Sequence, residues 1–406
     1  MAPLKLPLPP NFFTCPPLSS DEINYFRAVG LKCAEDIIAK AKVMPHMWTL
    51  IADDRDLQIY KAATATDNTP IEAGRSLHCA KMEVAATMDE AVALFRADSD
   101  IAAKAYTRRF GHIFLDALTL YTILPRSTRR PNDFMQIKWM AGKSPIDGLV
   151  AKRDVCFLET TLDVQVDGGK RAWVRAIVSV QLPSVPNLQH SHGLIRARHY
   201  GTGQLFVESD RPGYLCLTSI SDVDVRGSAV EWAREQANRH YVRSLHHFDR
   251  YLREDRLSRM PTLRPDDLCR LNSRRRCFAC EKMFGSFLRR KSNCSKCGEV
   301  FCDRCNGVWS VPGARLPVRA CIPCSVKTST KWLKEPPRVA TFSAAPAATL
   351  VVDHHHPPPR ASSSSDDLHF RVVGPISVNN SLSQCSDDDD DDDQSHYSES
   401  VAWYQG

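Results

Sequence analysis

Cysteines concentrate in one short stretch of this 406-residue chain. Residues 277–324 hold eight of the fifteen cysteines, arranged as four C-x-x-C pairs. A C-x-x-C turn places two thiolates on one metal ion, and tetrahedral Zn²⁺ takes four ligands. The four pairs therefore predict two zinc ions. Because all eight ligands would be cysteine, neither ion keeps a position for a reactive water, and we expect the zinc to be structural.

The spacing between the pairs predicts which of them share an ion. Pairing neighbours would give two separate ribbons, whereas pairing the first with the third and the second with the fourth gives an interleaved cross-brace. Only four residues separate Cys297 from Cys302, which is too few for two independent ribbons. The spacing therefore predicts one site of Cys277, Cys280, Cys302 and Cys305, and a second site of Cys294, Cys297, Cys321 and Cys324.

The segments around these cysteines resemble the FYVE zinc finger, a module that reads phosphoinositides. The similar segments are CFACEKMF (277–284), CGEVFCDRC (297–305) and PVRACIPC (317–324). The resemblance implies phosphate contacts from basic side chains and insertion of the preceding loop into a bilayer. The implied phosphoinositide-binding residues are Arg289, Arg290, Lys291 and Arg319, and the implied insertion residues are Phe287 and Leu288.

The chain departs from the FYVE pattern where the family selects its lipid. The family has Trp-x-x-Asp before the first cysteine, and LRPDDL (263–268) contains no tryptophan. The family has Arg-Arg-His-His-Cys-Arg at the third cysteine, and here the sequence is RRKSNCS (289–295). The remaining basic residues can attract phosphate. We therefore expect binding to anionic membranes through charge, with weak preference for one phosphoinositide.

Charge divides the chain more clearly than its total of +6 does. Residues 1–269 carry about +3, whereas residues 270–334 have fifteen Lys and Arg against three acidic residues, or +12. Residues 335–406 have three Arg against twelve acidic residues, or −9, including seven consecutive aspartates. The basic segment predicts an anionic partner. The acidic tail is too poor in apolar residues to build a core, so we expect it to be disordered.

The elements that precede the cysteines predict an α+β domain over residues 19–255. Capping-box spacings at 19–22 and 87–90 each indicate the start of a helix. A helix at about 228–253, with one apolar stripe, closes the domain. Between the helices, strands are expected in 46–63, 78–86, 159–182, 193–209 and 214–221, with hairpin turns at 167–169 and 201–203.

Such a sheet with a long helix across it either encloses a cavity or is filled by the helix's own side chains, and a packed core is the default. Four segments then resemble the START family of lipid-transfer domains. They are, in order, RDVCFLE (153–159), SVQLPSVPN (179–187), HGLIRAR (192–198) and SDVDVRGSAVEWA (221–233). The resemblance covers roughly residues 20–255 and implies a helix-grip fold around an apolar tunnel for one lipid.

The sequence thus predicts four parts. They are an N-terminal extension (1–18), a START-like lipid-binding domain (19–255), a FYVE-like finger (256–326) and a disordered low-complexity tail (327–406). No apolar run reaches the roughly 18–20 residues that cross a bilayer. The start, MAPLKLPLPP, lacks a signal-peptide core, and Ala2 excludes N-myristoylation. We expect a cytoplasmic protein that is peripheral on endosomal membranes.

Several functions compete for this architecture. The first is a lipid-binding adaptor or lipid-transfer protein, with a lipid in the cavity and a phosphoinositide-containing membrane at the finger. The second is a FYVE-related interaction module that binds a small GTPase. A RING-like ubiquitin ligase is a weaker match, because no histidine lies between the cysteines. No nucleic acid is expected, and without a nucleophile elbow, phosphate loop or HExxH motif we expect no enzyme.

Overall fold

In the computed structural model, all described residues fall within one compact unit, bounded by Met1 and Val352. The residues that the structure describes are 6–9, 11–42, 48–54, 57–62, 71–72, 74–110, 114–143, 151–166, 169–227, 232, 235, 239, 242–285 and 290–326. The predicted tail, 327–406, therefore lies outside the described residues.

An antiparallel sheet is the centre of the larger domain. Its strand order is β1-β2-β3-β11-β10-β7-β6-β5-β4, so that β3 and β11 join the N-terminal strands to the rest. The main strands are β1 (Trp48–Asp54), β2 (Leu57–Ala62), β3 (Arg75–Ala85), β4 (Phe114–Leu124), β5 (Phe134–Gly142), β6 (Arg153–Val166), β7 (Lys170–Ser179), β10 (Thr202–Glu208) and β11 (Tyr214–Asp224). Two short strands, β8 (Ile195–Arg196) and β9 (Arg198–His199), add to β6 and β11.

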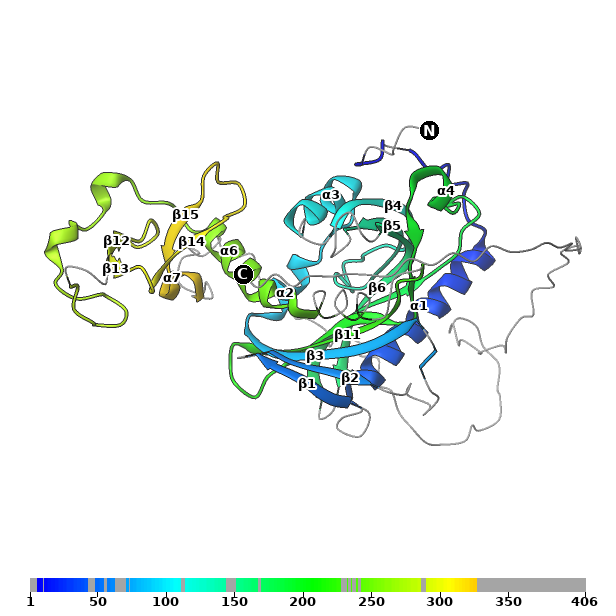
Figure 1. The fold of residues 1–406 in the computed structure, drawn as a ribbon, viewed down its shortest axis with the longest axis horizontal. Coiled ribbons are helices and arrows are strands. Elements are labelled where there is room, and N and C mark those ends of the chain that lie inside the picture. The colour runs from blue at the N-terminus through cyan, green and yellow to red at the C-terminus, as the bar shows by residue number, and fades with distance from the viewer. Residues whose placement is uncertain are drawn as a thin grey trace, which may run out of the picture. The chain divides into compact units, whose positions relative to one another are not determined.

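Helix α1 (Ser20–Lys42) covers one face of this sheet (Figure 1). The predicted capping box is present, since the Ser19 amide donates to the Glu22 carboxylate at 2.7 Å and the Glu22 amide donates to Ser19 Oγ at 3.2 Å. The buried stripe of α1 includes Phe26, Cys33 and Ile37, which pack on the apolar side chains of that face. The helix therefore lies where its 3.6-residue periodicity predicts.

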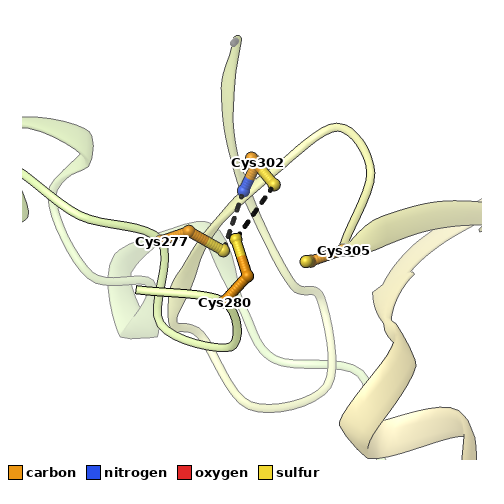
Figure 2. A group of neighbouring side chains, drawn as sticks. All are labelled: Cys277, Cys280, Cys302 and Cys305. Atoms are coloured by element: carbon orange, nitrogen blue, oxygen red, sulfur yellow. Dashed lines mark hydrogen bonds between the residues drawn. The ribbon is translucent and has the colours of Figure 1, made fainter. Parts of the chain in front are cut away.

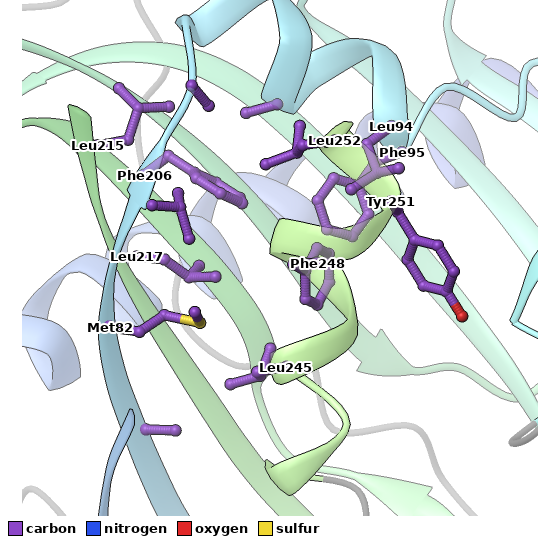
Figure 3. Close-up of a cluster of buried hydrophobic side chains, with 14 of the residues drawn as sticks. Met82, Leu94, Phe95, Phe206, Leu215, Leu217, Leu245, Phe248, Tyr251 and Leu252 are labelled. Atoms are coloured by element: carbon purple, nitrogen blue, oxygen red, sulfur yellow. The ribbon is translucent and has the colours of Figure 1, made fainter. Parts of the chain in front are cut away.

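Helices α2 (Met88–Leu94), α3 (Asp100–Arg109) and α6 (His246–Arg259) cover the opposite face. The predicted capping box of α2 is also present, with Thr87 and Glu90 bonded reciprocally. Figure 3 shows Phe248 and Leu252 of α6 beside Phe206 and Leu217 of the sheet. This aromatic and aliphatic cluster fixes α6 on the sheet, so the helix does fill part of the enclosed space with its own side chains.

Two of the sequence-based boundaries are wrong. The predicted hairpin turn at 201–203 does not form, because β10 begins at Thr202 and pairs with β7 and β11. The preceding β9 pairs with β11 instead of β10. The expected helix at 228–253 falls partly on residues outside the described ones. Residues 232, 235, 239, 242 and 243 are helical, but a turn at Ser244–Leu245 interrupts the helix before α6, which ends at Arg259.

The N-terminal extension takes part in the larger domain. Leu8 and Phe13 are buried in the apolar cluster behind β4, β5 and β6, and the Phe13 ring lies 5.5 Å from that of Trp139. The Leu8 amide donates to the buried Asp116 carboxylate at 2.6 Å. The described residues of this segment are therefore part of the fold.

The cysteine-rich segment contains only short elements. They are the 3₁₀ turns η2 (Pro265–Asp267) and η3 (Leu271–Ser273), the hairpins β12 (Lys291–Asn293) with β13 (Val300–Cys302) and β14 (Asn306–Trp309) with β15 (Val318–Cys321), and α7 (Ile322–Val326). One further short helix, α4 (Gln189–His192), lies between β7 and β8. Across the described part of the chain, no helix has the length and apolar composition needed to span a bilayer.

A glycine sets how closely α1 approaches the sheet, and this yields a stability prediction. A Cβ atom at Gly30 would lie 2.4 Å from Thr160 Oγ1 and 3.2 Å from Leu158 Cδ2. Gly30→Val should therefore destabilise the domain by about 1–3 kcal/mol, because it overpacks the contact. Denaturant unfolding measures the loss. The control is Ala28→Val, on the exposed side of the same helix; equal losses in both variants would contradict the prediction.

Candidate metal centre and cavity

Four cysteine side chains from two distant segments meet at the first quartet. Figure 2 shows Cys277, Cys280, Cys302 and Cys305 directed toward one another. Their sulfur atoms all lie within 4.8 Å of each other, and Cys280 Sγ is 3.8 Å from Cys302 Sγ. A disulfide needs about 2.05 Å between sulfurs. Tetrahedral Zn²⁺ with bonds of about 2.3 Å places its sulfurs about 3.8 Å apart, so the quartet has the dimensions of a zinc site.

The second quartet has the same dimensions. Cys294, Cys297, Cys321 and Cys324 place their sulfur atoms within 4.8 Å of one another, with 3.9 Å between Cys297 Sγ and Cys321 Sγ. These are the two interleaved groups that the spacing predicts. Each quartet takes one ligand from the end of a hairpin strand. Strand β13 ends at Cys302 of the first quartet, and β15 ends at Cys321 of the second.

Backbone amides prepare the sulfurs for a cation. The Cys302 amide donates to Cys277 Sγ at 3.4 Å, and the Cys321 amide donates to Cys294 Sγ at 3.2 Å. Burial raises the pKa of the Cys277 thiol, but backbone amides, those of Cys280 and Cys302 foremost, more than offset it and lower the pKa to about 6. Thiolates are the form that zinc binds, and four convergent cysteine sulfurs at each site are the donor set of a structural zinc ion.

The predicted lipid-contacting residues are only partly described. Phe287, Leu288 and Arg289 lie outside the described residues. Arg290 is exposed and directly precedes β12. Arg319 is exposed on β15, where its guanidinium donates to the Asn306 carbonyl at 3.2 Å. Exposed guanidinium groups at these two positions are available to phosphate.

The side chains between Arg290 and the third cysteine serve the finger itself. Lys291 Nζ donates to the Leu271 and Arg274 carbonyls at 3.2 and 2.9 Å. Asn293 Nδ2 donates to the Cys269 and Gly298 carbonyls at 2.7 and 2.9 Å. These side chains therefore tie the segment before the first cysteine to β12, at positions that the FYVE pattern gives to arginine and histidine.

A second candidate site lies between the sheet and the helices that cover it. A pocket that opens to solvent is lined mostly by apolar side chains. Its apolar lining comes from strands β4–β7 and from α3, α6 and the residues that flank α2, α3 and α6. It includes Phe95, Phe110, Met140, Val155, Phe157, Ile177, Leu245 and Phe248. The helix therefore leaves a hollow on the β5–β7 side of the aromatic cluster shown in Figure 3.

Charged side chains are buried at this cavity. Glu159 accepts hydrogen bonds from Lys138 Nζ and Arg175 Nε, both at 2.5 Å, and Arg175 also donates to Gln204 at 3.0 Å. Burial raises the pKa of Glu159, but Arg175 and then Lys138 outweigh it and hold the pKa at about 2. Arg175 and Gln204 line the cavity wall. The apolar hollow thus has one polar, permanently charged end.

His199 lies on the same wall. Its Nδ1 is 2.9 Å from Thr202 Oγ1, and burial lowers the pKa of the ring to about 4. The ring is therefore neutral at physiological pH and can exchange hydrogen bonds without adding charge. Sequence patterns assigned no residue to the cavity, although Leu245 and Phe248 of its lining belong to the apolar stripe expected on the helix at 228–253. The available signal was the placement of Lys138 and Glu159 inside otherwise apolar strands, where charges occur mainly as buried pairs.

The quartets yield a direct metal prediction. The native chain should hold two zinc ions, and Cys302→Ser should release at least one and unfold the finger, because structural zinc contributes about 10–16 kcal/mol in small modules. Elemental analysis and circular dichroism measure both effects. Cys216→Ser, at an exposed thiol on β11, is the control and should keep two ions. One zinc or none in the native chain would contradict the prediction.

Comparisons with known proteins agree with this geometry. Residues 124–255 match the family model of the START domain, and residues 269–330 match that of the FYVE zinc finger. The sheet extends N-terminal to the first match, since β1–β3 join it through β11. The order of the two matches is the order that the sequence predicts.

Three solved human structures are similar to the chain. STARD10 shares 16% identity over 60% of this chain and 80% of its own, with a TM-score of 0.38. StAR-related lipid transfer protein 5 shares 12% identity over 55% of this chain and 98% of its own, with a TM-score of 0.38. The lipid transfer and protein localization domain of StarD13 shares 17% identity over 56% of this chain and 94% of its own, with a TM-score of 0.35. By its two family matches, the chain contains a START domain followed by a FYVE zinc finger, a module that binds two zinc ions.

Proposed function

We propose that this chain is a non-enzymatic lipid-binding adaptor or lipid-transfer protein that docks on anionic membranes. The observation that carries the proposal is the apolar cavity between the sheet and α6, in the same chain as a zinc finger with exposed arginines. An apolar hollow of this kind is suited to a hydrocarbon ligand. Neither site needs a reactive group to bind its lipid.

The lining suggests how a lipid lies in the cavity. Aromatic and aliphatic side chains on β5–β7 and α6 offer burial to an acyl chain or ring system. At the charged end, Arg175, Gln204 and His199 face the same space and offer hydrogen bonds to a polar head group. We propose one lipid per domain, with its head group at this end.

The finger supplies membrane attachment in this proposal. The two cysteine quartets hold the zinc ions, Arg290, Arg319 and the neighbouring Arg289 contact phosphate, and Phe287 with Leu288 enters the bilayer. Each basic residue near an anionic surface contributes about 1 kcal/mol. Because Lys291 and Asn293 already bond carbonyls of the finger, we propose that charge dominates over recognition of one phosphate position. The membrane would be endosomal and contain phosphoinositides.

The same hydrogen bonds favour one alternative. Side chains that hold the finger together instead of facing a ligand are compatible with a FYVE-related module that binds a protein, such as a small GTPase. The two readings differ at the membrane: an interaction module retains its protein partner and does not bind vesicles.

The cavity proposal predicts that a bulky side chain blocks uptake. Val155→Trp places an indole at a partly buried position of the cavity wall, and it should lower uptake of dehydroergosterol and a fluorescent phosphatidylcholine at least tenfold. Gln165→Trp, at an exposed position of the same strand, is the control and should leave uptake unchanged. Fluorescence transfer from donor vesicles measures both. Native protein that takes up no sterol, phospholipid or ceramide probe would contradict the proposal.

The membrane proposal predicts a charge-dependent affinity. Vesicles with phosphatidylinositol 3-phosphate and charge-matched phosphatidylserine vesicles should bind with similar strength, and binding should weaken as salt rises. The double variant Arg290→Ala with Arg319→Ala should lose about tenfold or more in affinity. The control Lys170→Ala with Arg211→Ala removes two charges from exposed positions of the START domain and should bind as the native chain does.

Co-sedimentation at low and physiological salt separates the outcomes. A preference of tens of times for phosphatidylinositol 3-phosphate would contradict the charge-first interpretation. No binding to any anionic vesicle at low salt would exclude membrane docking by the finger and favour the protein-binding alternative.

A further inference from the structure

Helix α6 is shared by the START cavity and the zinc finger. Its N-terminal end lines the cavity, where Phe248 and Leu245, the residue just before the helix, form part of the wall. Its last turns are part of the finger's core, since Leu257 is completely buried in the same apolar cluster as Cys277 and Cys321. The two sites are therefore joined by about three turns of one helix.

A separate stripe of α6 faces the finger. Glu254 is 4% exposed, and its carboxylate accepts hydrogen bonds from Arg250 Nε at 2.9 Å and from the Ser310 amide of the finger at 3.0 Å. Arg250 also reaches the Val308 carbonyl at 3.5 Å. With Leu257, these residues have the i, i+4, i+7 spacing of one helix face.

The segment after α6 is bonded to the finger as well. Lys296 Nζ donates to the Met260 carbonyl at 2.8 Å and to Thr262 Oγ1 at 3.0 Å. The Leu263 amide donates to the Ser295 carbonyl at 2.9 Å. Both finger residues in these bonds, Ser295 and Lys296, lie inside the second C-x-x-C turn, Cys294–Cys297.

The helix is also clamped on its START side. Arg256 donates to the Glu90 carboxylate of α2 at 2.8 and 2.9 Å. Arg109 of α3 pairs with Asp255 at 2.9 Å. Together with the backbone hydrogen bond from the Leu263 amide to the Ser295 carbonyl, these contacts hold the C-terminal half of α6 between the START domain and the finger. Its N-terminal half, next to the turn at Ser244–Leu245, has the cavity on one side.

We infer that the zinc-loaded finger holds α6 in the position that closes the cavity, so that the metal centre controls how readily a lipid leaves. The finger contributes the Ser310 amide and the pocket around Leu257 to this hold. If the finger loses its structure, Glu254 loses a buried partner and Leu257 loses its packing. That a lipid is the ligand of the cavity rests on the proposed function. The coupling between the finger and the cavity rests on the contacts of α6 alone.

The test compares the full chain with and without these contacts. Glu254→Gln keeps the side-chain volume but removes the charge that the Ser310 amide bonds, and a chelator removes the zinc. Both should raise hydrogen exchange of the α6 amides in 246–252 and speed dehydroergosterol release about tenfold. Exchange within the β6–β7 hairpin should stay unchanged. Leu257→Ala, which leaves a cavity in the finger's core, should act in the same direction.

Ser258→Ala is the matched control, since its exposed hydroxyl donates to the Asp255 carbonyl within α6 itself. It should exchange and release as the native chain does. Elemental analysis must show two zinc ions in Glu254→Gln, so that the contact is tested apart from the metal. Unchanged α6 exchange in both Glu254→Gln and the chelated chain would overturn the inference. A chain that binds no probe would overturn the proposed function, while the exchange result would still decide the coupling.

Discussion

The buried carboxylate of Glu159 holds together the part of the sheet on which the cavity depends. It binds Lys138 from β5 and Arg175 from β7, so three neighbouring strands meet at one charge. Removing a single partner from such a group leaves an unpaired buried charge, which costs about 3–5 kcal/mol. The cluster is thus an internal constraint on strand geometry as well as a polar wall. Apolar side chains of the same face are left to surround the hollow.

The finger obeys a different constraint. Its strands have three or four residues each, and a module of this size buries too little apolar surface to fold on that basis alone. The interleaved quartets replace a large core by tying distant segments together. Because α6 and the residues after it enter this small core, the START domain and the finger share packing, which is unlike two modules joined by a free linker.

Sequence reasoning succeeded where a few residues determine the local geometry. The interleaved cysteine groups followed from spacing alone, and both capping boxes followed from one residue pair each. It failed where strand partners decide the outcome. Gly201 and Gly203 are typical of a hairpin turn, but β10 gains two neighbours by starting at Thr202. The START resemblance implied a cavity, but its lining could not be assigned residue by residue, because it comes from strands and helices whose relative positions no local pattern encodes.

The hydrogen bond between the Leu8 amide and Asp116 bears on where the START domain begins. Asp116 is 1% exposed, and its second carboxylate oxygen is already engaged by the Ala117 amide. A recombinant fragment that starts at Ser19, where the first helix is capped, would leave one buried carboxylate oxygen without its donor and uncover Trp139 behind it. Leaving such an acceptor unpaired costs about 1–3 kcal/mol. The described residues of the N-terminal extension are therefore part of the smallest unit that should be purified.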